Sequence, residues 1–204
     1  MANDLPLRVM LFDATRRRDL LTATWRAGGP LYRRMGWLDR HAGVASWEAG
    51  LRWLATVEPG RAIGEIQFWG HGRWGAALIG DDAIGASATR EGHRLHPLLE
   101  RVRARLAPDA AWWFRTCESF GAKPGHELAR AWSRFFGVRV AGFTHVIGPW
   151  QSGLHVLAPG AEPDWPLDEG LYDGASVSAP DGTARWSRPG LPNTVSFLTG
   201  ALPR

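Results

Sequence analysis

The chain has 204 residues, of which 45% are hydrophobic and 22% charged, a balance that supplies a sizeable core and excludes an intrinsically disordered protein. Its length suits one domain, because a single hydrophobic core stops growing only at roughly 250 to 300 residues. The net charge is +4, yet the arginines are scattered, and the densest run, Arg16-Arg17-Arg18, is followed directly by Asp19. We therefore expect no nucleic-acid partner, since tracking a phosphate backbone needs a continuous basic stripe with stacking aromatics.

The cysteine count and the length of the apolar stretches indicate in which cellular compartment we expect the protein. Cys117 is the only cysteine, which excludes an intrachain disulfide and favours a reducing environment. Residues 1–7 carry Asp4 where a signal peptide would have positive charge before an apolar run. No apolar stretch approaches the roughly 18 to 20 residues that span a bilayer. We expect a cytoplasmic protein with no membrane partner.

In chain order, the first predicted element is a strand. Residues 7–12 form a short apolar run that closes in a polar loop, which is typical of a buried strand. After an Arg- and Gly-containing stretch, apolar residues at helical spacing over 47–54 predict a helix that the Pro-Gly pair at 59–60 ends. Residues 63–69 predict a second strand, and it runs straight into the Gly-His-Gly turn at 70–72.

The middle of the chain continues the alternation. Residues 74–84 hold two short apolar pieces around a Gly-Asp-Asp turn and predict a β-hairpin. Leucines and a valine at helical spacing over 95–106 predict a second helix. Residues 111–116 predict a third core strand, which ends at Cys117.

A helix with apolar residues on one face over 128–136, ended by Gly137, and a fourth core strand at 138–143 complete the pattern. Strands that alternate with helices indicate a parallel sheet. Residues 153–157 and 194–198 predict further strands, separated by a Pro-, Gly- and acid-rich segment that we interpret as loops over the same domain.

Two strands of the predicted sheet each end in a reactive side chain, His71 and Cys117. In open α/β sheets, ligand sites form beyond the carboxyl ends of the strands. A thiol needs an imidazole nearby to favour the thiolate and to protonate the leaving group, so the positions predict a His–Cys pair. Glu118 adds negative charge that opposes the thiolate. The alternative is a buried cysteine that acts as a small hydrophobe and a histidine that serves only a glycine turn.

Two strings around this pair carry a family resemblance. The string IQFWGHG at 66–72, with WFRTCES at 113–119, resembles the caspase-like cysteine peptidases, which include caspases, metacaspases, gingipains, separases and the bacterial CHAT domains. The helix and strand at 125–142 also resemble those of CHAT-type members. The resemblance implies one caspase-like α/β domain over 1–204, a three-layer sandwich with a mostly parallel central sheet flanked by helices. Its core would span 7–158, with C-terminal loops and strands over 159–204.

The resemblance also implies an activity, that of a cysteine endopeptidase. Cys117 would attack the scissile carbonyl of a protein or peptide substrate, and His71 would supply the proton to the departing amine. Backbone N–H groups of Gly72 and Cys117 would hold the oxyanion. No metal and no cofactor is expected. Some relatives need an activating or regulatory partner protein, and the sequence leaves that open.

Arg115 departs from the family pattern, since many relatives carry Asp, and caspases Gln, two residues before the nucleophile. Strand alternation places Arg115 on the same side as Cys117, where a guanidinium would bind a substrate carboxylate, so we hypothesise cleavage after acidic residues. The alternative is that Arg115 pairs with an internal acid such as Glu118 or Asp13. Residues 15–17 follow the first strand, where caspases place another pocket arginine, but a surface basic run is the simpler interpretation.

Weaker signals come from one histidine and two tryptophans. His145 would join the His–Cys pair as a zinc ligand, yet the sequence has no close-spaced ligand pair, so we expect no metal. Trp150 and Trp165 fall in loops, where they would line a substrate cleft or pack into the core. The acidic stretch at 162–169 reads as an exposed loop, and it becomes a candidate self-cleavage site if the enzyme selects acids.

Two other function classes stay open. The first is a catalytically inactive caspase-like binding or scaffold module that recognises an acidic ligand or partner, because fold alone does not fix function. The second is a thiol hydrolase or acyltransferase that acts on a non-peptide substrate. A thiol-alkylating probe separates the classes, since a Cys117 that reacts no faster than a free thiol favours the scaffold.

Overall fold

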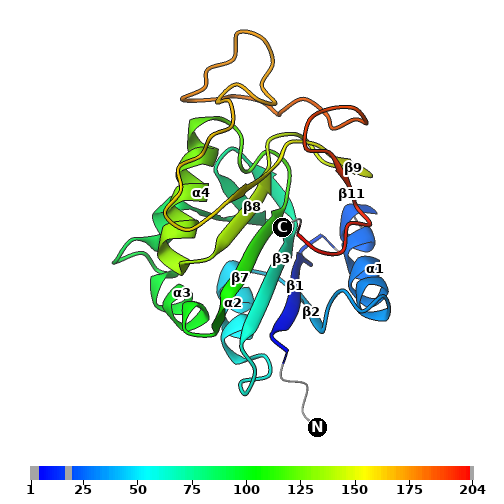
Figure 1. The fold of residues 1–204 in the computed structure, drawn as a ribbon, viewed down its shortest axis with the longest axis vertical. Helices are drawn as coiled ribbons and strands as arrows, with labels where there is room; N and C mark the ends of the chain where they lie inside the picture. Colours follow the sequence, from blue (N-terminus) through cyan, green and yellow to red (C-terminus); the bar gives the residue numbers. More distant parts are fainter. Residues whose placement is uncertain (1–4, 17–19, 203–204) are drawn as a thin grey trace.

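The fold is organised around a six-stranded sheet (Figure 1). The computed structural model describes residues 5–16 and 20–202, so two arginines of the basic run at 16–18 lie outside the described residues. The sheet strands are β1 (Leu7–Asp13), β2 (Arg40–Val44), β3 (Ile63–Trp69), β7 (Leu106–Arg115), β8 (Arg139–Phe143) and β10 (Leu154–Leu157), in the order β10-β8-β7-β3-β1-β2. All neighbours are parallel except β10, which runs antiparallel to β8.

The helices and the minor strands complete the chain. The helices are α1 (Leu20–Arg34), α2 (Trp47–Thr56), α3 (His96–Arg103), α4 (Ala122–Phe136) and the 3-10 turn η1 (Ala86–Thr89). A small antiparallel sheet joins β4 (His71–Arg73), β5 (Ala76–Ile79) and β6 (Asp82–Gly85), and a two-stranded sheet joins β9 (Trp150–Gln151) to β11 (Val195–Ser196). None of the described helices is long and apolar enough to cross a membrane.

Both faces of the central sheet are covered, which gives three layers. One face packs against α2, α3 and α4 in the main core, where the ring of Trp112 meets those of Trp132 and Phe136 at centroid distances of 5.5 and 4.9 Å. On the opposite face, α1 covers β1 through Tyr32. Further along that face the described part of the chain places no helix over β7 and β8, and Leu202 packs there instead. The C-terminal segment therefore completes the third layer beside α1.

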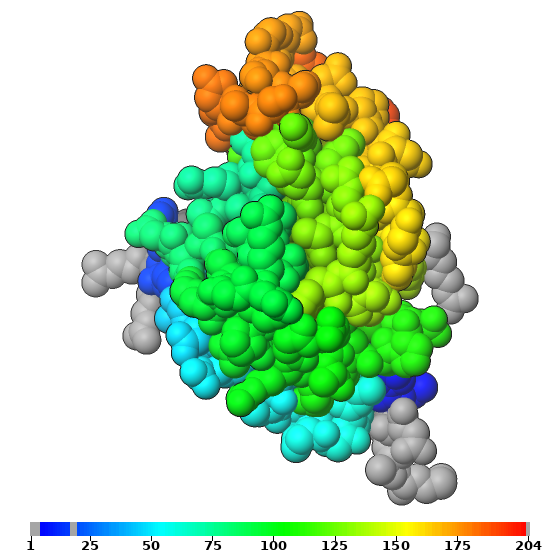
Figure 2. All heavy atoms as spheres, turned by 90° about the vertical axis from the view of Figure 1, so that its left-hand side faces the viewer, coloured from blue at the N-terminus to red at the C-terminus, as the bar shows by residue number. Residues whose placement is uncertain are grey.

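The main-core face is visible in space-filling form (Figure 2), where residues that follow β10 run along one side of α4. Glu162 binds there to Arg130 at 2.6 Å and also to Arg134. Trp165 is buried and donates its indole N–H to Phe120 O at 3.0 Å. The acidic stretch is thus held against the helix through these residues, and of the two loop tryptophans Trp165 belongs to the core.

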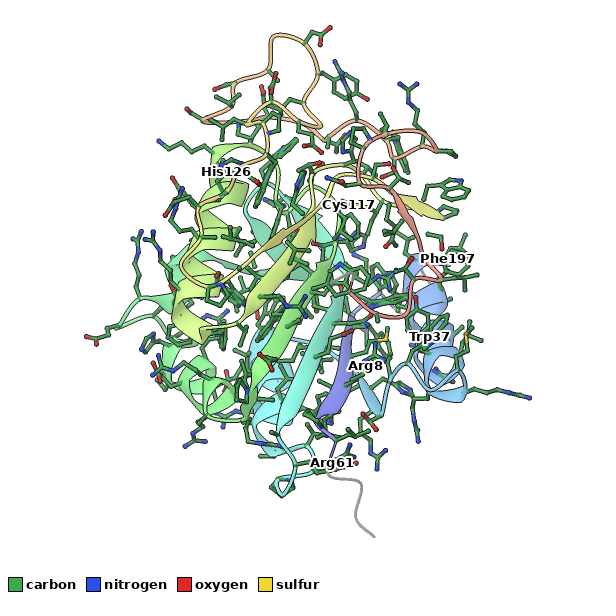
Figure 3. All side chains as sticks on the ribbon, in the orientation of Figure 1. Arg8, Trp37, Arg61, Cys117, His126 and Phe197 are labelled. Carbon is green, nitrogen blue, oxygen red and sulfur yellow. The ribbon has the colours of Figure 1, made fainter. Side chains whose placement is uncertain are left out.

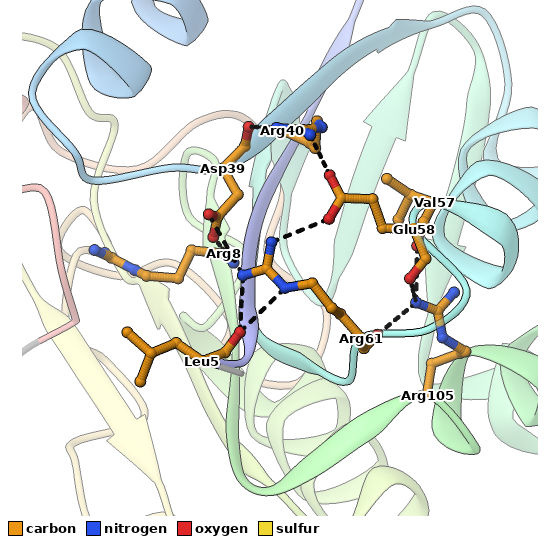
Figure 4. Close-up of polar contacts among 8 residues, drawn as sticks. All are labelled: Leu5, Arg8, Asp39, Arg40, Val57, Glu58, Arg61 and Arg105. Carbon is orange, nitrogen blue, oxygen red and sulfur yellow. Dashed lines mark hydrogen bonds and ion pairs between the residues drawn. The ribbon is translucent and has the colours of Figure 1, made fainter. Parts of the chain in front are cut away.

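The side chain of Arg105 binds the loop that precedes β3 (Figure 4). The guanidinium of Arg105 donates to the carbonyl oxygens of Leu54, Ala55, Val57, Glu58 and Arg61, at 2.7 to 3.3 Å. These carbonyls lie at the end of α2 and in the turn after it, where a helix leaves its last acceptors without partners. Arg105 therefore replaces the missing helical donors and fixes the entry into β3.

The strands predicted at 7–12, 63–69, 111–116 and 138–143 are confirmed as β1, β3, β7 and β8, and the hairpin is β5–β6. The helix predicted over 95–106 is wrong at its end, since α3 stops at Arg103 and Leu106 begins β7. Both α1 and β2 escaped sequence analysis.

Candidate active site

The register of two neighbouring strands brings His71 and Cys117 to one rim of the sheet. Trp69, the last residue of β3, lies opposite Arg115, the last residue of β7. His71 and Cys117 each follow two residues later, so they leave the sheet at the same level. Adjacent strands lie about 4.8 Å apart, which keeps the two main chains close at this point.

Gly72 packs against the main chain of the cysteine. A Cβ atom at this position would fall well inside contact distance of the carbonyl oxygen of Cys117 and within 2.8 Å of the Thr116 side chain. Only glycine allows such an approach, because every other residue would push the two segments apart. The resemblance implies that the N–H group of Gly72 holds the oxyanion. In the structure, Gly72 also packs closely against the main chain of Cys117.

Cys117 lies beyond the carboxyl end of β7, and its thiol is partly buried (Figure 3). The pKa of Cys117 is raised from its usual 9.0 to about 11: burial is the largest cause, the negative charge of Glu118 adds to it, and main-chain hydrogen bonds from Ile147 and from Cys117 itself act in the opposite direction. The sulfur is therefore protonated near neutral pH. Ile147, which follows β8, was not anticipated, and no motif in the sequence marks it.

The ring of His71 packs against a helix that the sequence analysis missed. Trp25 of α1 meets His71 edge-to-face, with ring centroids 5.3 Å apart. Such contacts stabilise a ring orientation by about 0.5 to 1.5 kcal/mol beyond burial. Helix α1 thus helps to position the ring of His71.

The loop after Cys117 is tightly built. Glu118 adopts a left-handed backbone with φ of 46°, a conformation that is uncommon for a residue other than glycine and recurs at functional sites. Its N–H donates to His145 O at 3.0 Å, and its carboxylate accepts from Ala184 N at 2.5 Å. Burial raises the pKa of Glu118. The residue after the thiol is therefore fixed by contacts from two distant loops.

Arg115 is 2% exposed, and its partners are neutral. It donates to the hydroxyl of Tyr32 at 3.0 Å and to the side-chain oxygen of Gln151 at 2.8 Å. It also donates to the carbonyl oxygens of Phe197 at 3.0 Å and Thr199 at 2.9 Å. The guanidinium further stacks between two indole rings, with centroids 4.3 and 4.5 Å away.

The alternative that Arg115 pairs with Glu118 or Asp13 is wrong. Asp13 accepts hydrogen bonds from Thr15 and from Gly80 N, and Glu118 accepts from Ala184 N. Neither acid bonds to the guanidinium. The described residues supply Arg115 with no carboxylate partner and leave its Nε without an acceptor.

A cavity of about 690 Å³ opens beside the loop after β8. Its lining includes His145, Asp168, Glu169, Arg185, Trp186 and Arg188. The buried ring of His145 shares a hydrogen bond of 2.9 Å with Thr144, whose hydroxyl donates to Glu169. Burial lowers the pKa of His145. His145 is thus part of a side-chain network in the wall of the cavity.

No group of three or more His, Cys, Asp or Glu side chains gathers closely enough to hold a metal ion within residues 5–16 and 20–202. Trp150 is 47% exposed and forms part of β9, so of the two loop tryptophans it is the one at the surface.

Comparisons with known proteins add no family to this geometry. The sequence matches no protein-family model, and a search of curated proteins finds no relative.

Proposed function

We propose that this chain is a caspase-like cysteine endopeptidase in which His71 and Cys117 act together on a peptide bond. His71 takes the thiol proton, and the sulfur attacks the scissile carbonyl to form a tetrahedral intermediate. When that intermediate collapses, the C–N bond breaks, His71 returns the proton to the departing amine, and an acyl thioester remains on Cys117. Water then adds to the thioester and releases the new carboxyl end and the free thiol.

The proposal rests on one observation: His71 and Cys117 each lie two residues beyond the paired ends of β3 and β7. Brought together by the register Trp69↔Arg115, an imidazole and a thiol lie where open α/β sheets place their ligands. The close packing of Gly72 against Cys117 fixes the two segments relative to each other. Main-chain hydrogen bonds from Ile147 and Cys117 lower the pKa of the thiol, and the N–H groups of these residues would hold the oxyanion once the carbonyl arrives.

Arg115 supports a preference for acidic residues at the cleaved position. A buried guanidinium with neutral hydrogen-bond partners would gain the attraction of an opposite charge from a carboxylate, which also accepts two parallel hydrogen bonds from the fork of N–H groups. Phe197 O and Thr199 O now occupy two of its donor directions. An acidic substrate side chain would replace these carbonyls.

The test is a panel of fluorogenic peptides that differ only in the residue before the cleaved bond. We expect turnover for Asp or Glu, none with Cys117→Ala, and a loss of roughly 10² to 10⁴ with His71→Ala, as for removal of a general acid–base group. His96→Ala, on α3 away from the rim, is the matched control and should keep full activity. A preference for Lys, or turnover that survives Cys117→Ala, would reject the proposal.

A binding module without hydrolysis is the second candidate, and one observation favours it. A thiol whose pKa is raised to about 11 is unreactive at neutral pH unless another group takes its proton. If His71→Ala leaves the alkylation rate of Cys117 unchanged while an acidic peptide still binds, the module describes the chain better than the peptidase does.

A further inference from the structure

The C-terminal segment 195–200, named here the strap, crosses the rim beside Arg115. It begins as β11, which pairs antiparallel with β9 through Val195↔Gln151 and Ser196↔Trp150. Phe197 N–H extends the ladder by donating to Pro149 O at 3.0 Å. In Figure 1, this segment passes next to α1.

Side chains of β1, β7 and α1 donate hydrogen bonds to the carbonyl groups of the strap. Phe197 O accepts from Arg115 at 3.0 Å and from the Tyr32 hydroxyl, and Thr199 O accepts from Arg115. Gly200 O accepts from Arg8 at 2.5 Å. The segment turns at 197–198, where Thr199 N–H donates to Ser196 O at 3.0 Å, and three of its carbonyl oxygens accept hydrogen bonds from side chains of three different elements.

The strap's own side chains contribute little in its middle. Phe197 and Leu198 are 40% and 44% exposed, so their rings and methyl groups are not what fixes the segment (Figure 3). The two ends are fixed by packing, since Val195 joins an apolar cluster and Gly200 lies directly against the ring of Trp37. Recognition by main chain with exposed side chains is how a protein binds an added peptide strand.

The strap is also coupled to the thiol. The segment that pairs with it, 149–151, begins two residues after Ile147, whose main-chain hydrogen bond lowers the pKa of Cys117. Ile147 and Val195 pack against the same apolar cluster. A strap that leaves would free both the edge of β9 and the donors of Arg115.

We infer that the edge of β9, together with Arg115 and Tyr32, is a binding site for a peptide that pairs with β9 and then turns over Arg115, and that the strap occupies this site as an internal, releasable ligand. The consequence for catalysis rests on the proposed function: the resting chain is closed, and substrate enters where the strap leaves. The binding site itself does not depend on hydrolysis. Residues 196–199, which pair with β9 and bond to Arg115, have to move, and Phe197 and Leu198 leave no core behind because their side chains are exposed.

A cross-strand lock tests the inference. Since Phe197 N–H donates to Pro149 O, the next pair, Ser196↔Trp150, falls at a non-hydrogen-bonded position, where Cα atoms lie about 4.5 Å apart, within the range of a disulfide. Cys117 is the only cysteine, so a Cys117→Ala chain with Trp150→Cys and Ser196→Cys contains that pair alone. The probe is a fluorescein-labelled peptide, Asn-Thr-Val-Ser-Phe-Leu-Thr-Gly, followed by anisotropy.

We expect the reduced protein to bind the peptide and the oxidised protein to bind it at least about tenfold more weakly, because a strap that is held in place competes at a high effective concentration. The same polypeptide is compared in two states, so misfolding of a variant does not explain a difference. As a second measurement, Phe197→Pro in the Cys117→Ala chain removes one ladder donor and should tighten peptide binding. Equal binding by the oxidised and reduced forms, or no gain with Phe197→Pro, would overturn the inference.

Discussion

The reactivity of Cys117 tests whether its thiol is buried in the resting chain. Burial raises its pKa from 9.0 to about 11. At pH 8, a thiol with a pKa of 9.0 is about 10% thiolate, whereas one with a pKa of 11 is about 0.1% thiolate, a difference of about 100-fold. Because the thiolate is the nucleophile, iodoacetamide should alkylate the resting chain, with the strap in place, about 100 times more slowly than the same thiol in the unfolded chain. This slow rate in the closed state does not by itself favour the scaffold, because the proposed peptidase is open only after the strap leaves.

The assay follows intact mass against time between pH 7 and pH 10.5, in buffer and in concentrated urea. The sign is fixed by the raised pKa: the native rate should climb about tenfold per pH unit over the whole range, while the unfolded rate levels off above pH 9. Glu118→Gln should speed native alkylation severalfold, since the negative charge of Glu118 raises the thiol pKa. A native rate that equals the unfolded rate, or that levels off below pH 9, would refute the reasoning.

Other substitutions test the packing and the buried arginines. Gly72→Ala places a Cβ atom against Cys117 O and should cost about 1 to 3 kcal/mol in the free energy of unfolding by urea, whereas Gly60→Ala, which meets no atom within 4 Å, should cost under about 1 kcal/mol. Arg105→Ala leaves five carbonyls without their donor and should cost about 3 kcal/mol, against no measurable change for the exposed Arg101→Ala. Arg115→Lys cannot reproduce the fork that binds two carbonyls at once and should lower the melting temperature by about 5 °C; an unchanged value would mean that those hydrogen bonds add nothing.

The sheet could be predicted from sequence where strands are buried on both faces. Residues 7–12 form a nearly continuous apolar run because both sides of β1 are covered, whereas in residues 63–69 apolar side chains share the buried strand β3 with Glu65 and Gln67, which bond to each other at 2.6 Å. Edge strand β2 lacks such a run, since most of its residues are partly or fully exposed. Helix α1 was missed because Gly28, Gly29 and Pro30, which normally interrupt helices, lie in its middle.

The candidate site could be predicted only as far as local order allows. A histidine and a cysteine at strand ends are visible along the chain, and strand alternation predicts that Arg115 lies on the same side as Cys117. What surrounds them comes from far away: Tyr32 lies 83 residues before Arg115, and Phe197 lies 82 residues after it. Such partners leave no spacing signal, so the burial of Arg115 could not be read from the sequence.

The buried tryptophans of β7 and α4 also affect which substitutions this protein tolerates. The indole N–H groups of Trp112, Trp113 and Trp132 are buried and find no acceptor among the described residues. Each unpaired donor costs about 1 to 3 kcal/mol, which is comparable with what the larger ring gains over phenylalanine by filling space. Exchanging one of these rings for phenylalanine therefore removes a penalty together with volume, and evolution has room to drift among aromatic residues at these positions.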